Sequence, residues 1–117
     1  MVRGTVAVLL VEKGPNKAQM IPLLGGKNIM GRQLDSDVVD TETGVSRKHA
    51  EIVETDDSYH LRDLSSSNDT YVNGNSIESR EHSLVDGDRI QLGPSKVIFV
   101  FKSDRANTAV FTLPTQT

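Results

Sequence analysis

The stretch SYHLRDLSSSNDTYVNGNSI, residues 58–77, decides the fold. Tyr59 and Leu61 alternate with polar residues, which is the period of a half-buried β-strand. A serine-rich polar segment follows, and then two short runs, TYV and NSI, flank Asn73-Gly74. A two-residue type I′ turn needs positive φ at both central positions, and Asn-Gly adopts it readily. This stretch therefore predicts a strand, a polar loop and a β-hairpin.

The rest of the chain repeats this organisation, and no segment keeps the period of a helix. Short apolar runs end at turn residues throughout: TVAVLLVE (5–12), AQMIPL (18–23), NIMGR (28–32), HAEIVET (49–55), DRIQL (88–92) and KVIFVF (96–101). This spacing is typical of an all-β sandwich or barrel. Because side chains alternate across a strand, the pattern predicts the core positions Ala50, Ile52, Tyr59, Leu61, Ile90 and Leu92.

Composition narrows the functional class. The 117 residues suit one domain, and with no cysteine there is no disulfide framework. A net charge of −3 and an aromatic content of 4% disfavour nucleic-acid binding, which usually needs a basic excess or stacking platforms. The first apolar run, residues 6–11, is too short for a signal peptide or a membrane span. We therefore expect a cytoplasmic protein, or a nuclear one if the source is a eukaryote, with no membrane partner.

Two polar segments, residues 31–48 and 63–70, lack strand alternation and are predicted to be loops. Arginine supplies forked donors that match phosphate oxygens, and serine hydroxyls, amides and backbone N–H groups supply neutral donors. The segments contain many such groups: Arg32, Ser46, Arg47, Lys48, Ser65, Ser66, Ser67 and Asn68. This donor set favours an anion-binding site, and Lys48 is expected to be a solvated charge.

Catalysis and metal binding are weaker interpretations of the same residues. Ser46, His49 and Asp63 are the residue types of a catalytic triad, but the G-x-S-x-G elbow is absent. His49, His60 and His82 lack the spacing of metal ligands, and no cysteine is present to complete a site. We therefore expect no enzyme activity, no metal and no cofactor.

Five blocks together resemble a forkhead-associated (FHA) domain, in order and in spacing: MGR (30–32), SDV (36–38), VSRKHAEI (45–52), YHLRDLSSSNDTYVNG (59–74) and LVDGDRIQLG (84–93). The resemblance covers about residues 6–101. It implies an all-β, eleven-stranded β-sandwich of two antiparallel-rich sheets (FHA/SMAD-like). On this basis residues 1–102 form the FHA domain, and residues 103–117 form a flexible C-terminal tail or linker.

The resemblance also implies roles for individual residues. Those expected to surround a phosphothreonine are Arg32, Ser46, Arg47, Ser67 and Asn68. Those expected to brace the loops are Gly31, His49, Asn73 and Gly74, and Asn73 could also approach the main chain of a bound peptide. Asp69 departs from the glycine that the family commonly has here. Aspartate tolerates the left-handed conformation, but its carboxylate next to a phosphate ligand would weaken binding unless it points away.

The expected function is phosphothreonine-peptide binding, which would join proteins after a Ser/Thr kinase has acted. The domain is expected to be a monomer that binds a phosphothreonine-containing protein. The alternative is a phosphate-independent scaffold or dimerisation domain on the same sandwich, which would not need the complete ligand set. The threonines of the expected tail have two alternative interpretations. They belong to a linker or a frayed end, or they are phosphorylated and bind the pocket of the same or a neighbouring molecule. These threonines are Thr108, Thr112, Thr115 and Thr117.

Overall fold

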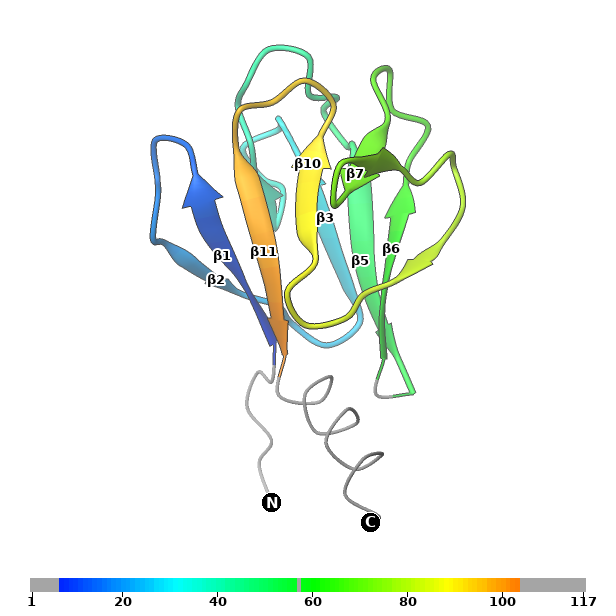
Figure 1. The fold of residues 1–117 in the computed structure, drawn as a ribbon. Helices are drawn as coiled ribbons and strands as arrows, with labels where there is room; N and C mark the ends of the chain where they lie inside the picture. Colours follow the sequence, from blue (N-terminus) through cyan, green and yellow to red (C-terminus); the bar gives the residue numbers. More distant parts are fainter. Residues whose placement is uncertain (1–6, 57, 104–117) are drawn as a thin grey trace.

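The computed structural model describes residues 7–56 and 58–103, and this part of the chain contains eleven β-strands (Figure 1). The strands are β1 (Ala7–Lys13), β2 (Met20–Pro22), β3 (Lys27–Gly31), β4 (Val38–Val39), β5 (Ala50–Thr55), β6 (Ser58–Asp63), β7 (Thr70–Val72), β8 (Asn75–Ser76), β9 (His82–Ser83), β10 (Arg89–Leu92) and β11 (Ile98–Ser103). The predicted all-β, eleven-stranded fold is confirmed.

The strands form two sheets that face each other. One has six strands in the order β2-β1-β11-β10-β7-β8, and the other has five in the order β4-β3-β5-β6-β9. The β3–β4 pair is parallel, whereas the other registered pairs are antiparallel. The first and last strands are neighbours, and Ala7 pairs with Ser103. The predicted two antiparallel-rich sheets are therefore present.

The core lies between the sheets and contains the positions that alternation predicted. All six are at most 4% exposed: Ala50, Ile52, Tyr59, Leu61, Ile90 and Leu92. The Tyr59 and Phe101 rings meet across the sheets with centroids 5.4 Å apart. Burial of each large apolar side chain contributes about 1.5–3 kcal/mol, so this shared interior fixes how the two sheets face each other.

The turn between β7 and β8 agrees with the sequence, but two short strands were not predicted. Asn73 and Gly74 have φ angles of 51° and 86°, as the type I′ turn between β7 and β8 requires. The strands β4 and β9 were not predicted from the pattern. Each is two residues long, and two residues carry no measurable alternation.

The directions of the strands bring three loops to one end of the sandwich. The segments after β4, β6 and β10 lie at the same end of the sandwich, opposite the beginning of β1 and the end of β11 (Figure 1). Among the described residues, no helix has the length and apolar character needed to cross a membrane. The tail expected from residue 103 lies, beyond Ser103 itself, outside the described residues, as do its four threonines.

Candidate functional site

A pocket of about 390 Å³ opens between the segments that follow β3, β4 and β6. We call it the loop pocket, and it is lined by Arg32, Thr41, Thr43, Gly44, Val45, Ser46, Ser67 and Asn68. Four of the five residues expected to contact phosphothreonine are therefore brought together. The fifth, Arg47, is exposed next to Ser46 but does not line the loop pocket.

Arg32 directly follows β3 and is held on one side only. Its backbone N–H donates to the Ser46 carbonyl at 3.0 Å, and its Nε donates to the Val45 carbonyl at 2.9 Å. The rest of the described chain provides no hydrogen-bond acceptor for the two Nη groups. The guanidinium is thus oriented by the protein while its terminal donors remain free to bind a ligand.

Two contacts join the loop after β4 to the loop after β6. The Ser67 N–H donates to Ser46 Oγ at 3.1 Å, and Asn68 Nδ2 donates to the Gly44 carbonyl at 2.9 Å. Because Ser46 Oγ accepts from Ser67, its own hydrogen is left to donate elsewhere. These contacts place hydroxyl and amide groups from two loops on one pocket wall.

His49 is fully buried beneath these loops. Its Nδ1 accepts from the Ser46 N–H at 3.0 Å, and its Nε2 lies 2.7 Å from the Asp69 carbonyl. A carbonyl only accepts, so Nε2 carries the proton and the ring is a neutral brace between both loops. Because both nitrogens bind backbone groups, neither activates the Ser46 hydroxyl, and the triad considered from the sequence is not assembled.

Asp63 organises the loop after β6 instead. Its carboxylate accepts from the Ser66 N–H at 3.0 Å, the Ser66 hydroxyl at 2.5 Å and the Thr70 hydroxyl at 2.7 Å. Burial alone would raise the pKa of Asp63, but the Ser66 and Thr70 hydrogen bonds outweigh it and the pKa is lowered. Sequence reasoning missed this role, although aspartate and serine residues that cluster after an apolar run are a general turn signal.

Backbone geometry at Gly31 and Asp69 shapes the same loops. A Cβ atom at Gly31 would collide with the Arg47 carbonyl oxygen, so the close approach of these segments requires glycine. Asp69 has a φ of 66°, and its carbonyl accepts from Gly93 at 2.9 Å as well as from His49. Asp69 therefore does adopt the left-handed conformation, and it is exposed to solvent.

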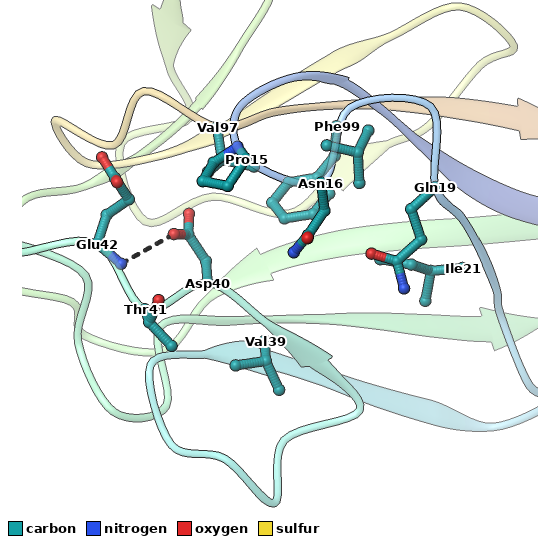
Figure 2. Close-up of a pocket in the computed structure, with 11 residues that line it drawn as sticks. Pro15, Asn16, Gln19, Ile21, Val39, Asp40, Thr41, Glu42, Val97 and Phe99 are labelled. Carbon is teal, nitrogen blue, oxygen red and sulfur yellow. Dashed lines mark hydrogen bonds between the residues drawn. The ribbon is translucent and has the colours of Figure 1, made fainter.

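A second carboxylate, Asp40, supports the loop after β4 (Figure 2). It is 2% exposed and accepts from the Ser95 hydroxyl at 2.7 Å and the Glu42 N–H at 3.1 Å. Burial raises the pKa of Asp40, and these hydrogen bonds offset the effect only in part. Asp40 thus links the β4–β5 and β10–β11 segments, a role that the sequence did not reveal.

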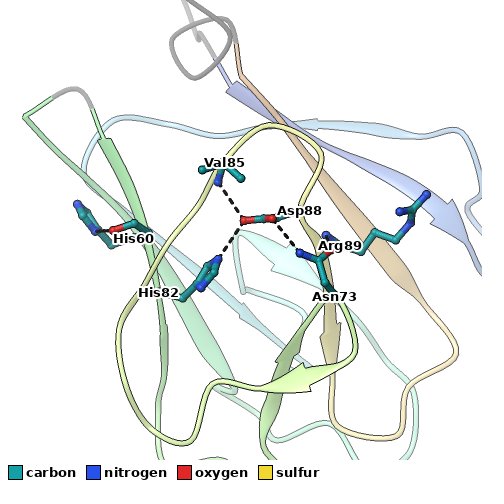
Figure 3. Close-up of polar contacts among 7 residues, drawn as sticks. His60, Asn73, His82, Val85, Asp88 and Arg89 are labelled. Atoms are coloured by element: carbon teal, nitrogen blue, oxygen red, sulfur yellow. Dashed lines mark hydrogen bonds and ion pairs between the residues drawn. The ribbon is translucent and has the colours of Figure 1, made fainter. Parts of the chain in front are cut away.

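Asn73 is not among the residues that line the loop pocket; it ties the β7–β8 hairpin to β10 (Figure 3). Its Nδ2 donates to Asp88 at 3.0 Å, and its Oδ1 accepts from the Arg89 N–H at 3.0 Å. Asp88 also accepts from His82 Nε2 and from the Val85 N–H, each at 3.0 Å. Burial alone would raise the pKa of Asp88, but these three hydrogen bonds together lower it.

The loop pocket therefore combines one oriented arginine with neutral donors, and its lining contains no carboxylate. Charge-assisted hydrogen bonds from guanidinium to an oxyanion are roughly twice as strong as neutral ones. Within residues 7–56 and 58–103, no group of three or more His, Cys, Asp or Glu side chains is placed to hold a metal ion. The arrangement suits a compact anion with several acceptor oxygens.

Comparisons with known proteins agree with this chemistry. Residues 28–93 match the sequence profile of the FHA domain. The chain is 37% identical over 101 residues to the oxoglutarate dehydrogenase inhibitor of Corynebacterium jeikeium, a match covering 86% of this chain and 68% of that protein. It is 34% identical over 94 residues to the glycogen accumulation regulator GarA of Mycobacterium tuberculosis, covering 80% of this chain and 57% of GarA.

A solved FHA domain from work on phosphothreonine-dependent FHA domain interactions has the same fold. It matches with a TM-score of 0.73 and 34% sequence identity, covering 84% of this chain and 96% of that chain. The likeness thus extends across the described sandwich in both sequence and structure.

Proposed function

Because this chain belongs to the FHA domain family, we propose that it is a binding module, not an enzyme, which recognises phosphothreonine in a partner protein. The observation that carries the proposal is the loop pocket, where Arg32, Ser46, Ser67 and Asn68 converge from three loops. A phosphothreonine brings about −1.5 to −2 charges and three strong acceptor oxygens, which match this donor set.

In the proposed complex, the free Nη groups of Arg32 bind two phosphate oxygens. The Ser46 hydroxyl and the loop after β6 bind the remaining oxygen and the adjacent peptide, and Arg47 reaches in from the pocket rim. Each charge-assisted hydrogen bond contributes roughly 1.5–3 kcal/mol, so loss of two lowers the affinity at least about a hundredfold. Binding would therefore be switched on by phosphorylation.

The same proposal covers the biological setting. The domain acts in the cytoplasm as a monomer and docks onto a partner that a Ser/Thr kinase has phosphorylated. The chain spans 57% of the length of GarA and 68% of the Corynebacterium inhibitor, so any metabolic target is a proposal for the whole protein. The names of these two relatives are those of metabolic regulators, which makes a phosphorylated metabolic enzyme or its regulator the partner to test first.

Titration with matched synthetic peptides tests the function. Phosphothreonine, phosphoserine and unmodified threonine versions of degenerate peptides are titrated by fluorescence polarisation. We expect phosphothreonine to bind most tightly and the unmodified peptide to bind at least about a hundredfold more weakly. Equal binding of all three would instead support phosphate-independent association.

Arg32→Ala provides the matched protein variant. It should abolish phosphopeptide binding while changing thermal unfolding little, because only one side-chain hydrogen bond, from Nε to Val45, is lost. Arg32→Lys keeps the charge but removes the forked geometry, so we expect partial loss of affinity. A large drop in stability for Arg32→Ala would contradict its assignment as a ligand residue.

A further inference from the structure

A second cavity lies beside the loop pocket, and Thr41 lines both (Figure 2). We call it the edge cavity; it opens between the β1–β2 turn and the segment after β4 and has a volume of about 60 Å³. A cavity needs roughly 10–15 Å³ to hold one water molecule, so this space admits more than one heavy atom. It is large enough to receive part of a side chain.

The edge cavity has an apolar floor and a polar rim. Ile21, Val97 and Phe99 contribute to the floor from β2, the end of the β10–β11 loop and β11. Figure 2 shows Gln19 and Glu42 on opposite sides of the cavity, with the Asp40 carboxylate, which is 2% exposed, between them. An apolar stem with a polar tip matches such a site, because the stem gains burial while the tip stays hydrogen-bonded.

The charge of the edge cavity is opposite to that of the loop pocket. Two carboxylates, Asp40 and Glu42, contribute to its lining, and none of its described lining residues is basic. Neither Asp40 nor Glu42 forms an ion pair with another described residue, so both carboxylates lack a countercharge within the described part of the chain. A cation in the cavity would supply it, while Arg32 next door supplies the positive charge for an anion.

We propose that the edge cavity binds a lysine side chain from the same partner segment that carries the phosphothreonine. This inference rests on the proposed function, because the shared residue Thr41 makes the two cavities neighbouring subsites for one chain. The four methylenes of the lysine lie on the apolar floor, and its ammonium group reaches the Glu42 and Asp40 carboxylates. The preferred ligand thus carries a phosphate and a basic side chain at a fixed separation.

Positional scanning tests this subsite. Short phosphothreonine peptides in an alanine-serine background carry a single lysine at each flanking position in turn, and a parallel series carries norleucine, which has the same stem without the charge. We expect lysine to bind roughly two- to fivefold tighter than norleucine at one position or at two adjacent ones. An arginine series measures whether the larger guanidinium also fits.

Protein variants assign the preference to the edge cavity. Glu42→Gln retains an oxygen to accept from the Lys96 N–H, as Glu42 does at 3.1 Å, but removes the negative charge. It should erase the lysine preference while leaving the norleucine peptide's affinity unchanged, and Glu42→Lys should make lysine the weaker binder. Glu78→Gln is the matched control, because it removes an exposed charge between β8 and β9, at the far edge of the six-stranded sheet.

The outcomes separate this inference from the proposed function. Equal affinity for lysine and norleucine at every position, with phosphothreonine still required, would overturn the lysine subsite alone. A lysine preference that falls equally in Glu42→Gln and Glu78→Gln would show general electrostatics and would also overturn it. Absence of phosphopeptide binding by the wild-type domain would overturn the function and the subsite together.

Discussion

The exposed ligand candidates of the loop pocket and the residues that hold its loops differ in burial and in bonding. Arg32, Ser67 and Asn68 are exposed, and they keep donors that the protein itself does not use. Gly31 and His49 are buried, and every polar atom of the His49 ring is bound. Binding and stability should therefore depend on different residues, even where they are adjacent in sequence.

The adjacent pair Gly31 and Arg32 shows what this difference teaches. Glycine is required because the Arg47 carbonyl occupies the space of a side chain, whereas Arg32 points into the pocket. A motif read from sequence therefore mixes two functions: one residue brings the loops together, and the next uses the resulting space. Variants of each kind can break or sharpen the distinction.

Gly31→Ala should have the largest effect on stability. The added Cβ meets backbone, which cannot move aside without separating β3 from the loop after β4, so we expect a loss of about 3 kcal/mol or more. Urea unfolding measures it. Gly25→Ala is the control, because its Cβ would approach only the flexible end of Glu54; a similar loss in both variants would contradict the explanation.

His49→Ala should have the next largest effect. It leaves the Ser46 N–H and the Asp69 carbonyl without their partner and opens a buried cavity, so we expect a loss of about 3 kcal/mol. Phosphopeptide affinity should fall as a consequence of loosened loops. His60→Ala, at a half-exposed position on β6, should cost less than about 1 kcal/mol. A His49→Ala domain that unfolds at the same urea concentration as the wild type would contradict the proposed role of His49 in holding the two loops together.

Low pH should weaken the hydrogen bonds that Asp88 accepts and so lower the free energy of unfolding. Its pKa is lowered in the folded state, so its contribution to stability is complete above about pH 5, begins to decline near the unfolded value of about 3.9, and is lost as the pH falls through the lower folded value. Urea unfolding at a series of pH values measures this decline. In Asp88→Asn the decline should be smaller but not absent, because the pKa of Asp63 is lowered as well. Identical pH profiles would contradict the assignment.

Asn68→Ala should change stability least and binding strongly. Only the hydrogen bond to the Gly44 carbonyl is lost from an exposed side chain, so we expect a loss of about 0.5–1 kcal/mol. Phosphothreonine-peptide affinity should nevertheless fall at least about tenfold. Asn75→Ala, in the exposed β7–β8 hairpin, serves as the control and should alter neither quantity measurably.

The sequence predicted the parts of the structure that depend on local pattern. Alternation located the buried faces of β5, β6 and β10, and Asn73-Gly74 located a hairpin, because both signals are confined to neighbouring residues. The FHA resemblance located the four ligand candidates that meet in the loop pocket. Their roles as phosphate ligands stay a prediction until binding is measured.

The contacts that the sequence did not predict join distant segments. Asp40 and Ser95 are far apart in the chain, and nothing in either neighbourhood indicates that their side chains meet. The edge cavity was missed for the same reason, since its lining comes from the β1–β2 turn, the segment after β4, and β11. Arg47 illustrates the converse: the motif placed it beside the ligand residues, but its side chain is not part of the pocket wall.

The pairing of Ala7 with Ser103 has a consequence for protein engineering. The described chain enters and leaves the sandwich through adjacent strands at the end opposite the loop pocket (Figure 1). Closely spaced entry and exit points favour insertion of a domain into a host loop and circular permutation. The sandwich is therefore suited to insertion into a surface loop of a fluorescent reporter protein, with its pocket facing away from the host.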